Sequence, residues 1–370
     1  MTHTQKALPC VLIKNDMSRF FSKKFASLVP YTPGEQPRNK KYIKLNTNES
    51  PFPPSPLVIR TVLEEAASLQ LYSDPEAGIL TAKLAEIYET SPDRIIVTNG
   101  SDEVLDFAFN AFCDSEHPIV FPDITYGFYS VFAKKLGIPY VEIPLTEDFR
   151  IDVNDYIGIN KNIVIANPNA PTGIALPLSD IERIAASNPD NVVIIDEAYV
   201  DFGGESAVKL TEKYENLLVV QTFSKSRSLA GARLGFAIGS KALIHDLHTL
   251  RYSTNPYNVN RMTCAAGYAA LTENGYYTQN AQTIIRTRGY CKAELEKRGF
   301  EVLDSKANFL FARSNDIDGK RLYLALKDRG ILVRHFDKER IKDFCRITIG
   351  TAMEMKALID AVDDILGENK

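Results

Sequence analysis

The chain has 370 residues, of which 45% are hydrophobic and 24% charged, and its formal net charge is −4. This composition is that of an ordinary globular protein, and the slightly acidic balance gives no reason to expect nucleic acid as a partner. The length exceeds the usual size of one domain, so two domains are predicted.

Five cysteines are spread along the chain without a Cys-x-x-Cys pair, namely Cys10, Cys113, Cys264, Cys291 and Cys345. An odd, widely spaced set argues against a disulfide framework or a metal site and favours a reducing cytoplasm. Charged residues interrupt positions 1–25, and no run approaches the roughly 18 apolar residues of a membrane span. We therefore expect a cytoplasmic protein without membrane contact, whose residues 1–30 form an N-terminal extension.

The first part of the chain after this extension favours turns and then helices. Residues 31–56 are rich in proline, asparagine and glycine, which predicts extended or turn structure. A helix is expected from Pro56 to about residue 69, because proline is acceptable in the first helical turn. A second helix is expected over about 78–89.

An alternation of strands and helices follows. Strands are expected at 94–98, 118–121, 140–143, 162–166, 192–196 and 217–220. Helices are expected to open at 99–103, to span about 126–136, and to run from a Ser179 cap to about residue 187. Continuous apolar strands separated by helices predict a mostly parallel sheet buried on both faces. Ligands of such sheets bind outside the carboxyl ends of the strands.

After about residue 258 the pattern changes. Two long helices, at about 258–272 and 276–298, precede a compact set of strands and helices. These are expected at 308–312, 322–329, 331–334, 344–349 and 353–366. We predict a large domain over 57–257 and a smaller α+β domain made of 31–56 and 258–370.

Lys225 is the first candidate for chemistry. It follows an apolar strand and stands among hydroxyl side chains, with Arg233 eight positions later. Desolvation favours the neutral amine, which is the nucleophile needed for a Schiff base. The hydroxyls and the guanidinium would suit a bound phosphate. The segment alone also fits an ordinary strand-to-loop junction with a surface lysine.

Asp196 ends a strand of four apolar residues, where a carboxylate is costly unless it is paired. A protonated pyridine nitrogen would be such a partner, and Tyr199 would place a phenol beside the same ring. A helix cap or a structural ion pair is the alternative. Lys225 comes 29 residues later, one strand further on, so both side chains can face one ligand.

Other candidates occur at helix and strand ends. Ser101 and Asp102 open a helix, whose N-terminus favours an anion, although a plain cap is the alternative. Tyr126 could present its face to an aromatic cofactor or simply belong to the core. Arg334 and Arg346 flank strands, and an arginine side chain can bind a carboxylate or a phosphate through two parallel hydrogen bonds, that is, in a bidentate way. Exposed, ion-paired arginines are the alternative for both.

Together these residues resemble the fold type I pyridoxal-phosphate aminotransferases, and most closely the histidinol-phosphate aminotransferase family, from about residue 31 to 366. The motifs that carry the resemblance are Leu-Asn-Thr-Asn-Glu at 45–49, Asn-Gly-Ser-Asp-Glu at 99–103, Asn-Pro-Asn-Ala-Pro-Thr-Gly at 167–173, Asp-Glu-Ala-Tyr at 196–199, Thr-Phe-Ser-Lys at 222–225, Leu-Ala-Gly at 229–231 and Arg-Ile-Thr-Ile-Gly at 346–350. The resemblance implies an α/β fold, with a mostly parallel seven-stranded sheet flanked by helices in the large domain. It also implies pyridoxal 5′-phosphate as cofactor and a homodimer.

The resemblance implies a role for each candidate. Lys225 would bond covalently to the cofactor and shuttle a proton, Asp196 would keep the pyridine nitrogen protonated, and Tyr199 would reach the 3′ oxygen. Further cofactor contacts would come from Ser101, Asp102, Tyr126, Ser224, Arg233 and, across the dimer, Tyr72. The substrate contacts would come from Tyr31, Asn48, Arg334 and Arg346. Of these, Arg346 would take a carboxylate, and Arg334 and Tyr31 would take the phosphate of histidinol phosphate.

One position departs from the family pattern. Ala170 stands where the family has an asparagine before Pro-Thr-Gly, and alanine has no donor for the cofactor's 3′ oxygen. That contact is therefore lost or moved. Asn169 and Asn167 are the candidates to replace it, and we assign the contact to Asn169.

The expected activity is transamination of histidinol phosphate with 2-oxoglutarate, which gives imidazole acetol phosphate and L-glutamate in histidine biosynthesis. An aromatic or broad-specificity aminotransferase and a threonine-phosphate decarboxylase-like enzyme would share the cofactor residues, so only the substrate side separates them. A regulator with an aminotransferase-like domain is a third possibility. The presence of both Lys225 and Asp196 argues against it, as does the lack of a helix-turn-helix extension.

Overall fold

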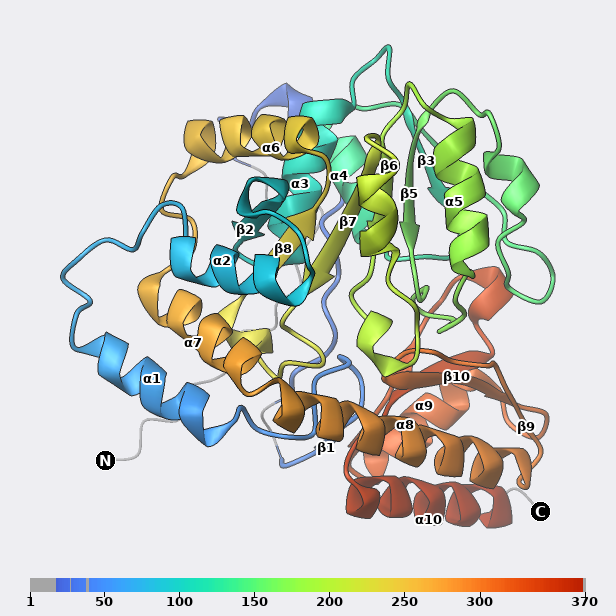
Figure 1. Cartoon of the computed structure of the whole chain (residues 1–370). Coiled ribbons are helices and arrows are strands. Elements are labelled where there is room, and N and C mark those ends of the chain that lie inside the picture. Colours follow the sequence, from blue (N-terminus) through green and yellow to red (C-terminus); the bar gives the residue numbers. More distant parts are fainter. Residues whose placement is uncertain (1–17, 27, 38–39, 369–370) are drawn as a thin grey trace.

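The computed structural model describes residues 18–26, 28–37 and 40–368, so most of the predicted N-terminal extension lies outside the described residues (Figure 1). The α-helices are α1 (Pro56–Ala66), α2 (Gly78–Ile87), α3 (Ser101–Phe112), α4 (Phe128–Leu136), α5 (Leu178–Ser187), α6 (Lys241–Thr254), α7 (Arg261–Thr272), α8 (Asn274–Glu296), α9 (Gly319–Asp328) and α10 (Ala352–Glu368). The strands are β1 (Ile43–Lys44), β2 (Ile95–Thr98), β3 (Ile119–Pro122), β4 (Tyr140–Ile143), β5 (Asn162–Ala166), β6 (Val193–Asp196), β7 (Leu217–Thr222), β8 (Gly235–Ile238), β9 (Phe300–Val302), β10 (Phe309–Ser314), β11 (Ile331–Leu332), β12 (Arg334–His335) and β13 (Phe344–Thr348).

The larger sheet has seven strands in the order β2-β8-β7-β6-β5-β3-β4. Neighbouring strands are parallel except at β8, which runs antiparallel to both β2 and β7. The predicted mostly parallel, seven-stranded sheet is therefore confirmed. Sequence reasoning did not locate β8, because its four residues follow a turn-rich segment and are too few to show a period.

Successive residues of the central strands enter different hydrophobic clusters. In β6, Val193 and Ile195 belong to a cluster that also takes in α2, α5 and α7, whereas Ile194 belongs to one that takes in α3, α4 and α6. Side chains of a strand point alternately to the two faces, so a sheet covered on both faces needs apolar residues at every position. The parallel strands β5, β6 and β7 end at a common edge, and Asp196 is the last residue of β6.

A smaller antiparallel sheet, in the order β12-β13-β10-β9, packs with α8, α9 and α10 in the orange and red part of Figure 1. The single strand predicted over 331–334 is wrong, because the chain divides at Val333. Strand β11 pairs in parallel with β1, and β12 pairs with β13. This division ties the N-terminal segment to the sheet that carries Arg334 and Arg346.

Some helix ends also differ from the predicted ones. Helix α5 begins at Leu178, so Ser179 is not its cap. Helix α7 begins later than residue 258, because the side chain of Asn260 caps it by accepting a bond from the main chain of Thr263. Helix α6 was missed altogether, although Ser240 caps it and its apolar face is buried.

The division into domains stays a prediction, and we propose that the boundary lies within α8 rather than near residue 257. Tyr277 packs into the cluster of the large sheet, whereas Ala281, about one turn later, packs into the cluster of the small sheet. Helix α7 packs against α1 and shares the large-sheet cluster. It therefore belongs with the large domain by its contacts.

Candidate active site

Eight of the predicted cofactor residues line one cavity of about 280 Å³ at the carboxyl edge of the large sheet. They are Ser101, Asp102, Tyr126, Asp196, Tyr199, Ser224, Lys225 and Arg233. The ends of two strands and the start of one helix bring these residues together. Strand β6 ends at Asp196, β7 ends at Thr222, shortly before Lys225, and α3 begins at Ser101. Thr47 and Glu49 line the same cavity from the N-terminal segment.

The amine of Lys225 is not held in an ion pair with any described residue. Its Nζ lies 3.5 Å from the main-chain oxygen of Thr47 and 5.6 Å from the centre of the Tyr199 ring. The nearby carboxylate of Glu49 is instead bonded to Lys44, at 2.7 Å. The Lys225 amine is thus available to react with a carbonyl group in the cavity.

Asp196 is a buried carboxylate with two hydrogen bonds. It accepts one from the Tyr129 hydroxyl at 2.8 Å and one from the main-chain nitrogen of Ala198 at 3.2 Å. Burial raises the pKa of Asp196 to about 6, against the effect of these two bonds. At neutral pH the side chain is an anion in a water-poor place, which favours a bound cation such as a protonated ring nitrogen.

Replacing Asp196 with asparagine should stabilise the ligand-free protein at neutral pH. The pKa of Asp196 is about 6 in the folded chain and 3.8 ordinarily, so the folded state binds this proton more tightly than the unfolded state. The resulting stability is present below about pH 4 and is lost, by on the order of 3 kcal/mol, as the pH rises through about 6. Urea unfolding near pH 4 and pH 8 should show an advantage of the variant only at the higher pH. An equal difference at both would contradict this assignment.

The N-terminus of α3 is open toward the same cavity. Gly100 precedes the helix with φ of +83°, and no side chain caps it, so the main-chain N–H groups of Ser101 and Asp102 are available for an anion, whereas that of Glu103 donates to the Gly100 carbonyl. Arg233 Nη2 lies 3.1 Å from Asp102, and the Thr222 hydroxyl donates to that of Ser224 at 3.0 Å. A helix N-terminus, hydroxyls and a guanidinium together suit a phosphate group.

Replacing Gly235 with alanine should damage this anion subsite. A Cβ at the first residue of β8 would lie 2.4 Å from the nitrogen of Ser101 and 2.5 Å from the carbonyl carbon of Gly100. Both are main-chain atoms, so β8 or the helix start must move, at a cost of about 1–3 kcal/mol of unfolding free energy. Chemical denaturation and titration with pyridoxal phosphate measure the two effects. Gly275→Ala, where a Cβ meets nothing within 4 Å, is the control and should lose neither stability nor affinity.

Asn169, to which we assigned the contact that Ala170 cannot make, is absent from the described lining of the first cavity, and its role stays a prediction that its hydrogen bonds do not favour. Its Nδ2 donates to the main chain of Ile124 and to Thr172, and its Oδ1 accepts from Thr125. The side chain is thus committed within its own loop and the neighbouring one. Ala170 itself lines the cavity.

Asn48 is placed behind the cavity rather than in its lining. Its Nδ2 donates to the Tyr199 hydroxyl at 3.0 Å, and its Oδ1 accepts from the Thr348 hydroxyl at 2.9 Å. Asn48 is fully buried, so these bonds fix the position of the Tyr199 ring from the side of the small sheet.

A second cavity, of about 320 Å³, adjoins the first, because Tyr126 and Ala170 line both. The predicted substrate residues Tyr31, Arg334 and Arg346 line this second cavity. The ring of Tyr31 lies 6.1 Å from that of Tyr126, measured between centroids. The structure therefore places the predicted substrate residues next to the predicted cofactor residues.

Arg334 and Arg346 face each other across antiparallel strands, and neither has a carboxylate partner among the described residues. Arg334 donates to the main-chain oxygens of Thr32 and Pro33. Arg346 donates to that of Asn46 at 3.1 Å, and its buried Nε has no partner in the described part of the chain. Burial lowers the pKa of Arg346. Two adjacent, unpaired guanidiniums favour a multiply charged anion in this cavity.

Tyr72 lies outside both cavities of its own chain. Its side chain is 79% exposed, and its ring stacks on that of Tyr257 at 4.5 Å between centroids. Sequence reasoning missed several residues of the site, among them Thr47 and Glu49 in the lining of the first cavity and Tyr129, whose hydroxyl bonds to Asp196. A buried tyrosine on a helix face is ordinarily a core residue.

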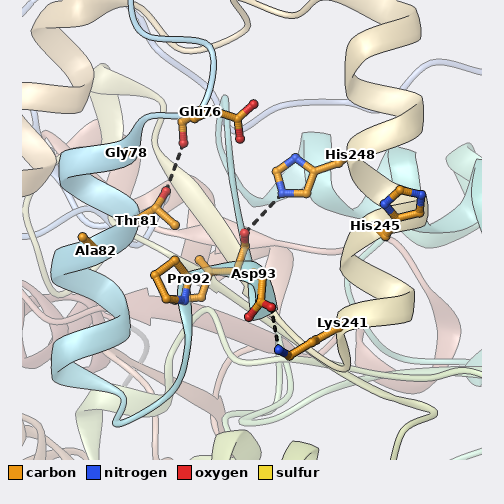
Figure 2. Close-up of a pocket in the computed structure, with 10 residues that line it drawn as sticks. Glu76, Gly78, Thr81, Ala82, Pro92, Asp93, Lys241, His245 and His248 are labelled. Atoms are coloured by element: carbon orange, nitrogen blue, oxygen red, sulfur yellow. Dashed lines mark hydrogen bonds and ion pairs between the residues drawn. The ribbon is translucent and has the colours of Figure 1, made fainter.

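Another cavity, of about 600 Å³ and so larger than either of these two, lies between α2 and α6, and none of the predicted site residues lines it (Figure 2). Its charged groups are engaged locally, since Lys241 pairs with Asp93 at 2.6 Å and His248 contacts the main chain of Ile95 at 3.4 Å. Among the described residues no group of three His, Cys, Asp or Glu side chains could hold a metal ion, and no helix is long and apolar enough to cross a membrane.

Comparisons with known proteins agree with this geometry. A family model for aminotransferase class I and II matches residues 40–362. The histidinol-phosphate aminotransferase of Brachyspira hyodysenteriae is 51% identical over 352 residues, which cover 95% of this chain and 99% of that protein. The histidinol-phosphate aminotransferase of Clostridium acetobutylicum is 47% identical over 351 residues, covering 95% and 100%.

Solved structures share the fold. Histidinol-phosphate aminotransferase from Sinorhizobium meliloti, in complex with pyridoxal-5′-phosphate, matches with a TM-score of 0.87 and 23% identity over 96% of this chain and 100% of that one. Aspartate aminotransferase from Thermus thermophilus matches with a TM-score of 0.77 and 20% identity, over 88% and 91%. With the family match over most of its length and relatives identical at about half of all positions, the chain belongs to the aminotransferase class I and II family.

Proposed function

We propose that this chain is a pyridoxal-phosphate-dependent aminotransferase that converts histidinol phosphate and 2-oxoglutarate into imidazole acetol phosphate and L-glutamate, a step of histidine biosynthesis. The observation that carries the choice of substrate is that Arg334 and Arg346 lie side by side and neither has a carboxylate partner among the described residues. A phosphate monoester has a charge near −2 at neutral pH, which suits two guanidiniums better than a neutral aromatic side chain does. The names of the two relatives reported above support the same substrate.

Pyridoxal phosphate fits the residues of the first cavity. When bound, it supplies an electron sink that stabilises negative charge on the substrate carbon from which a proton is removed. The first turn of α3, with Ser224 and Arg233, would hold its phosphate, and Asp196 would pair with its protonated ring nitrogen. Tyr126 would provide an aromatic surface for the ring.

Lys225 would have two tasks. Its amine would hold the cofactor covalently between turnovers, and after release it would move a proton between Cα of the bound substrate and the C4′ atom of the cofactor, as transfer of the amino group requires. Tyr199 would supply a hydroxyl beside the ring oxygen, and Asn48 fixes where that hydroxyl lies. These roles use the Lys225 amine, which has no ion pair among the described residues, and the half-buried hydroxyl of Tyr199.

The second cavity would bind the rest of each substrate. Arg346 would take the α-carboxylate of glutamate, and Arg334, Arg346 and Tyr31 would surround the phosphate of histidinol phosphate. Binding of either anion would relieve the repulsion between the two guanidiniums and give the buried Nε of Arg346 an acceptor.

A substrate panel tests this proposal. With L-glutamate as amino donor, kcat/KM for imidazole acetol phosphate should exceed that for phenylpyruvate and for oxaloacetate by at least about a hundredfold, because those acids leave the phosphate contacts unmade. A higher kcat/KM for phenylpyruvate would favour an aromatic aminotransferase. A higher value for oxaloacetate would equally overturn the choice of substrate.

We also propose a homodimer in which Tyr72 of the partner subunit completes the phosphate subsite. The exposed stack of Tyr72 on Tyr257 supports this, as do the exposed side chains of Leu63 and Leu71 in the same region, because exposed apolar groups favour contact with another chain. Sedimentation should give twice the chain mass of 41.3 kDa. A fully active monomer would contradict the proposal.

The proposed location is the cytoplasm. The cysteines of the described residues, Cys113, Cys264, Cys291 and Cys345, are free thiols. Free thiols are typical of a reducing compartment, where biosynthetic enzymes of small metabolites work. Fractionation of cells that carry a tagged chain would test this location.

A further inference from the structure

We infer that Tyr129 is a positioning residue, which orients the carboxylate of Asp196 toward the ring nitrogen of the cofactor. The inference rests on the proposed role of Asp196, and its test distinguishes the two. Nothing in the sequence pattern singles out Tyr129, so the argument depends on its packing and hydrogen bond.

The position of the Tyr129 hydroxyl is determined by the packing of its ring. Tyr129 lies in the first turn of α4 and is fully buried. Its ring stands edge-on to that of Tyr126, at 5.6 Å and 86°, and to that of Phe121 in β3, at 5.8 Å and 61°. A ring packed against two others in a dense interior has no room to turn its hydroxyl elsewhere. That hydroxyl donates to Oδ2 of Asp196 at 2.8 Å.

The carboxylate of Asp196 depends on this bond for its orientation. Its Oδ1 accepts only the longer bond from the main chain of Ala198, at 3.2 Å, and Oδ2 has no other donor among the described residues. Each carboxylate oxygen has two acceptor positions, so both oxygens keep one free for a ligand. Without the Tyr129 hydroxyl, the carboxylate can rotate about its Cβ–Cγ bond.

The direction of the hydrogen bond is clear from the charges around it. Burial and then the negative charge of Asp196 raise the pKa of Tyr129 well above its ordinary value, so the phenol keeps its proton and donates it. The Tyr129 bond is also the largest influence that lowers the pKa of Asp196. Other charges act on Asp196 from neighbouring elements, namely Lys225, which favours its ionised form, and Asp102, which opposes it.

The test compares pyridoxal phosphate with its 1-deaza analogue, in which carbon replaces the ring nitrogen. Both carry the same aldehyde and phosphate, so only the ring-nitrogen contact separates their dissociation constants. The two constants are measured by titrating the ligand-free wild type, Tyr129→Phe and Asp196→Asn. In wild type, the dissociation constant of the 1-deaza analogue should exceed that of pyridoxal phosphate. This ratio of dissociation constants should fall to about one in Asp196→Asn. In Tyr129→Phe the ratio should be about tenfold smaller than in wild type, as expected for a lost hydrogen bond to a charged group.

The control is Tyr156→Phe. Tyr156 is equally buried, and its hydroxyl has no partner among the described residues, so this variant should keep the wild-type preference. Phenylalanine preserves the Tyr129 ring contacts, and Tyr129→His offers a second variant if the first does not fold.

Two outcomes separate the claims. If wild type prefers pyridoxal phosphate and Tyr129→Phe shows the same preference, the inference about Tyr129 is wrong. If wild type binds both ligands equally, the proposed role of Asp196 fails, and the inference fails with it. A merely structural effect of Tyr129→Phe would weaken both ligands alike and would also overturn the inference.

Discussion

Replacing Lys225 with alanine should abolish both turnover and the visible absorption band of the bound cofactor. Among the described residues, Lys225 is the only lysine in the lining of the first cavity, so no other amine described there can take over the covalent bond or the proton transfer. Loss of a positioned acid–base group alone costs about 10²–10⁴ in rate, so kcat should fall at least about a thousandfold. Absorption spectra with added pyridoxal phosphate and a steady-state assay measure the two effects.

Lys209→Ala is the matched control for this experiment. The Lys209 side chain is 86% exposed, and its distance to Glu89 is 3.8 Å, so the pair is a weak surface contact. The control should keep the absorption band and the wild-type kcat. Persistence of the band and of turnover in Lys225→Ala would show that another group bonds the cofactor.

Replacing Arg334 with alanine should impair the reaction of histidinol phosphate far more than that of phenylalanine, each with 2-oxoglutarate as acceptor. Arg334 lines the second cavity and has no carboxylate partner among the described residues, so its charge is available for a substrate phosphate. A lost charge-assisted bond costs about 1.5–3 kcal/mol, so kcat/KM for histidinol phosphate should fall about 10- to 100-fold. The value for phenylalanine should change by less than about threefold.

Two further variants interpret the result. Arg334 also donates to the main-chain oxygens of Thr32 and Pro33, so its replacement by alanine also frees the segment beside Tyr31. The variant Arg334→Lys keeps the positive charge and should recover part of the lost kcat/KM for histidinol phosphate. Arg313→Ala removes an arginine that pairs with Glu301 at 2.6 Å on the same sheet. This variant should leave kcat/KM unchanged for both substrates. Equal losses for both substrates in Arg334→Ala would rule out a specific phosphate contact.

The large sheet could be predicted because the central strands carry runs of consecutive apolar residues, and the helical layers on both faces of the sheet explain why. The short strands could not. Strands β11 and β12 have two residues each, and they pair with β1 and β13, so their separation depends on partners elsewhere in the chain. No local pattern carries that information.

The cofactor residues were easier to predict than their supports. Asp196 ends β6 and Lys225 comes shortly after the neighbouring parallel strand β7, so the sheet itself brings both residues to one edge. Asn169 differs, because its own loop supplies competing donors and acceptors, which decide where the side chain points. Tyr129 could not be predicted, because its hydroxyl reaches Asp196 only once α4 is packed against the sheet.

In the described part of the chain, Tyr126 and Ala170 are the two residues that line both cavities. The arginines and Tyr31 of the second cavity belong to stretches around residues 31 and 334–346, whereas the first cavity draws on other parts of the chain. Substitutions of Tyr31 or Arg334, which the first cavity does not share, can therefore change which molecule is accepted while the reaction itself is preserved. A duplicated copy of such a gene can diverge to a new amino acid through a handful of changes, without passing through an inactive ancestor.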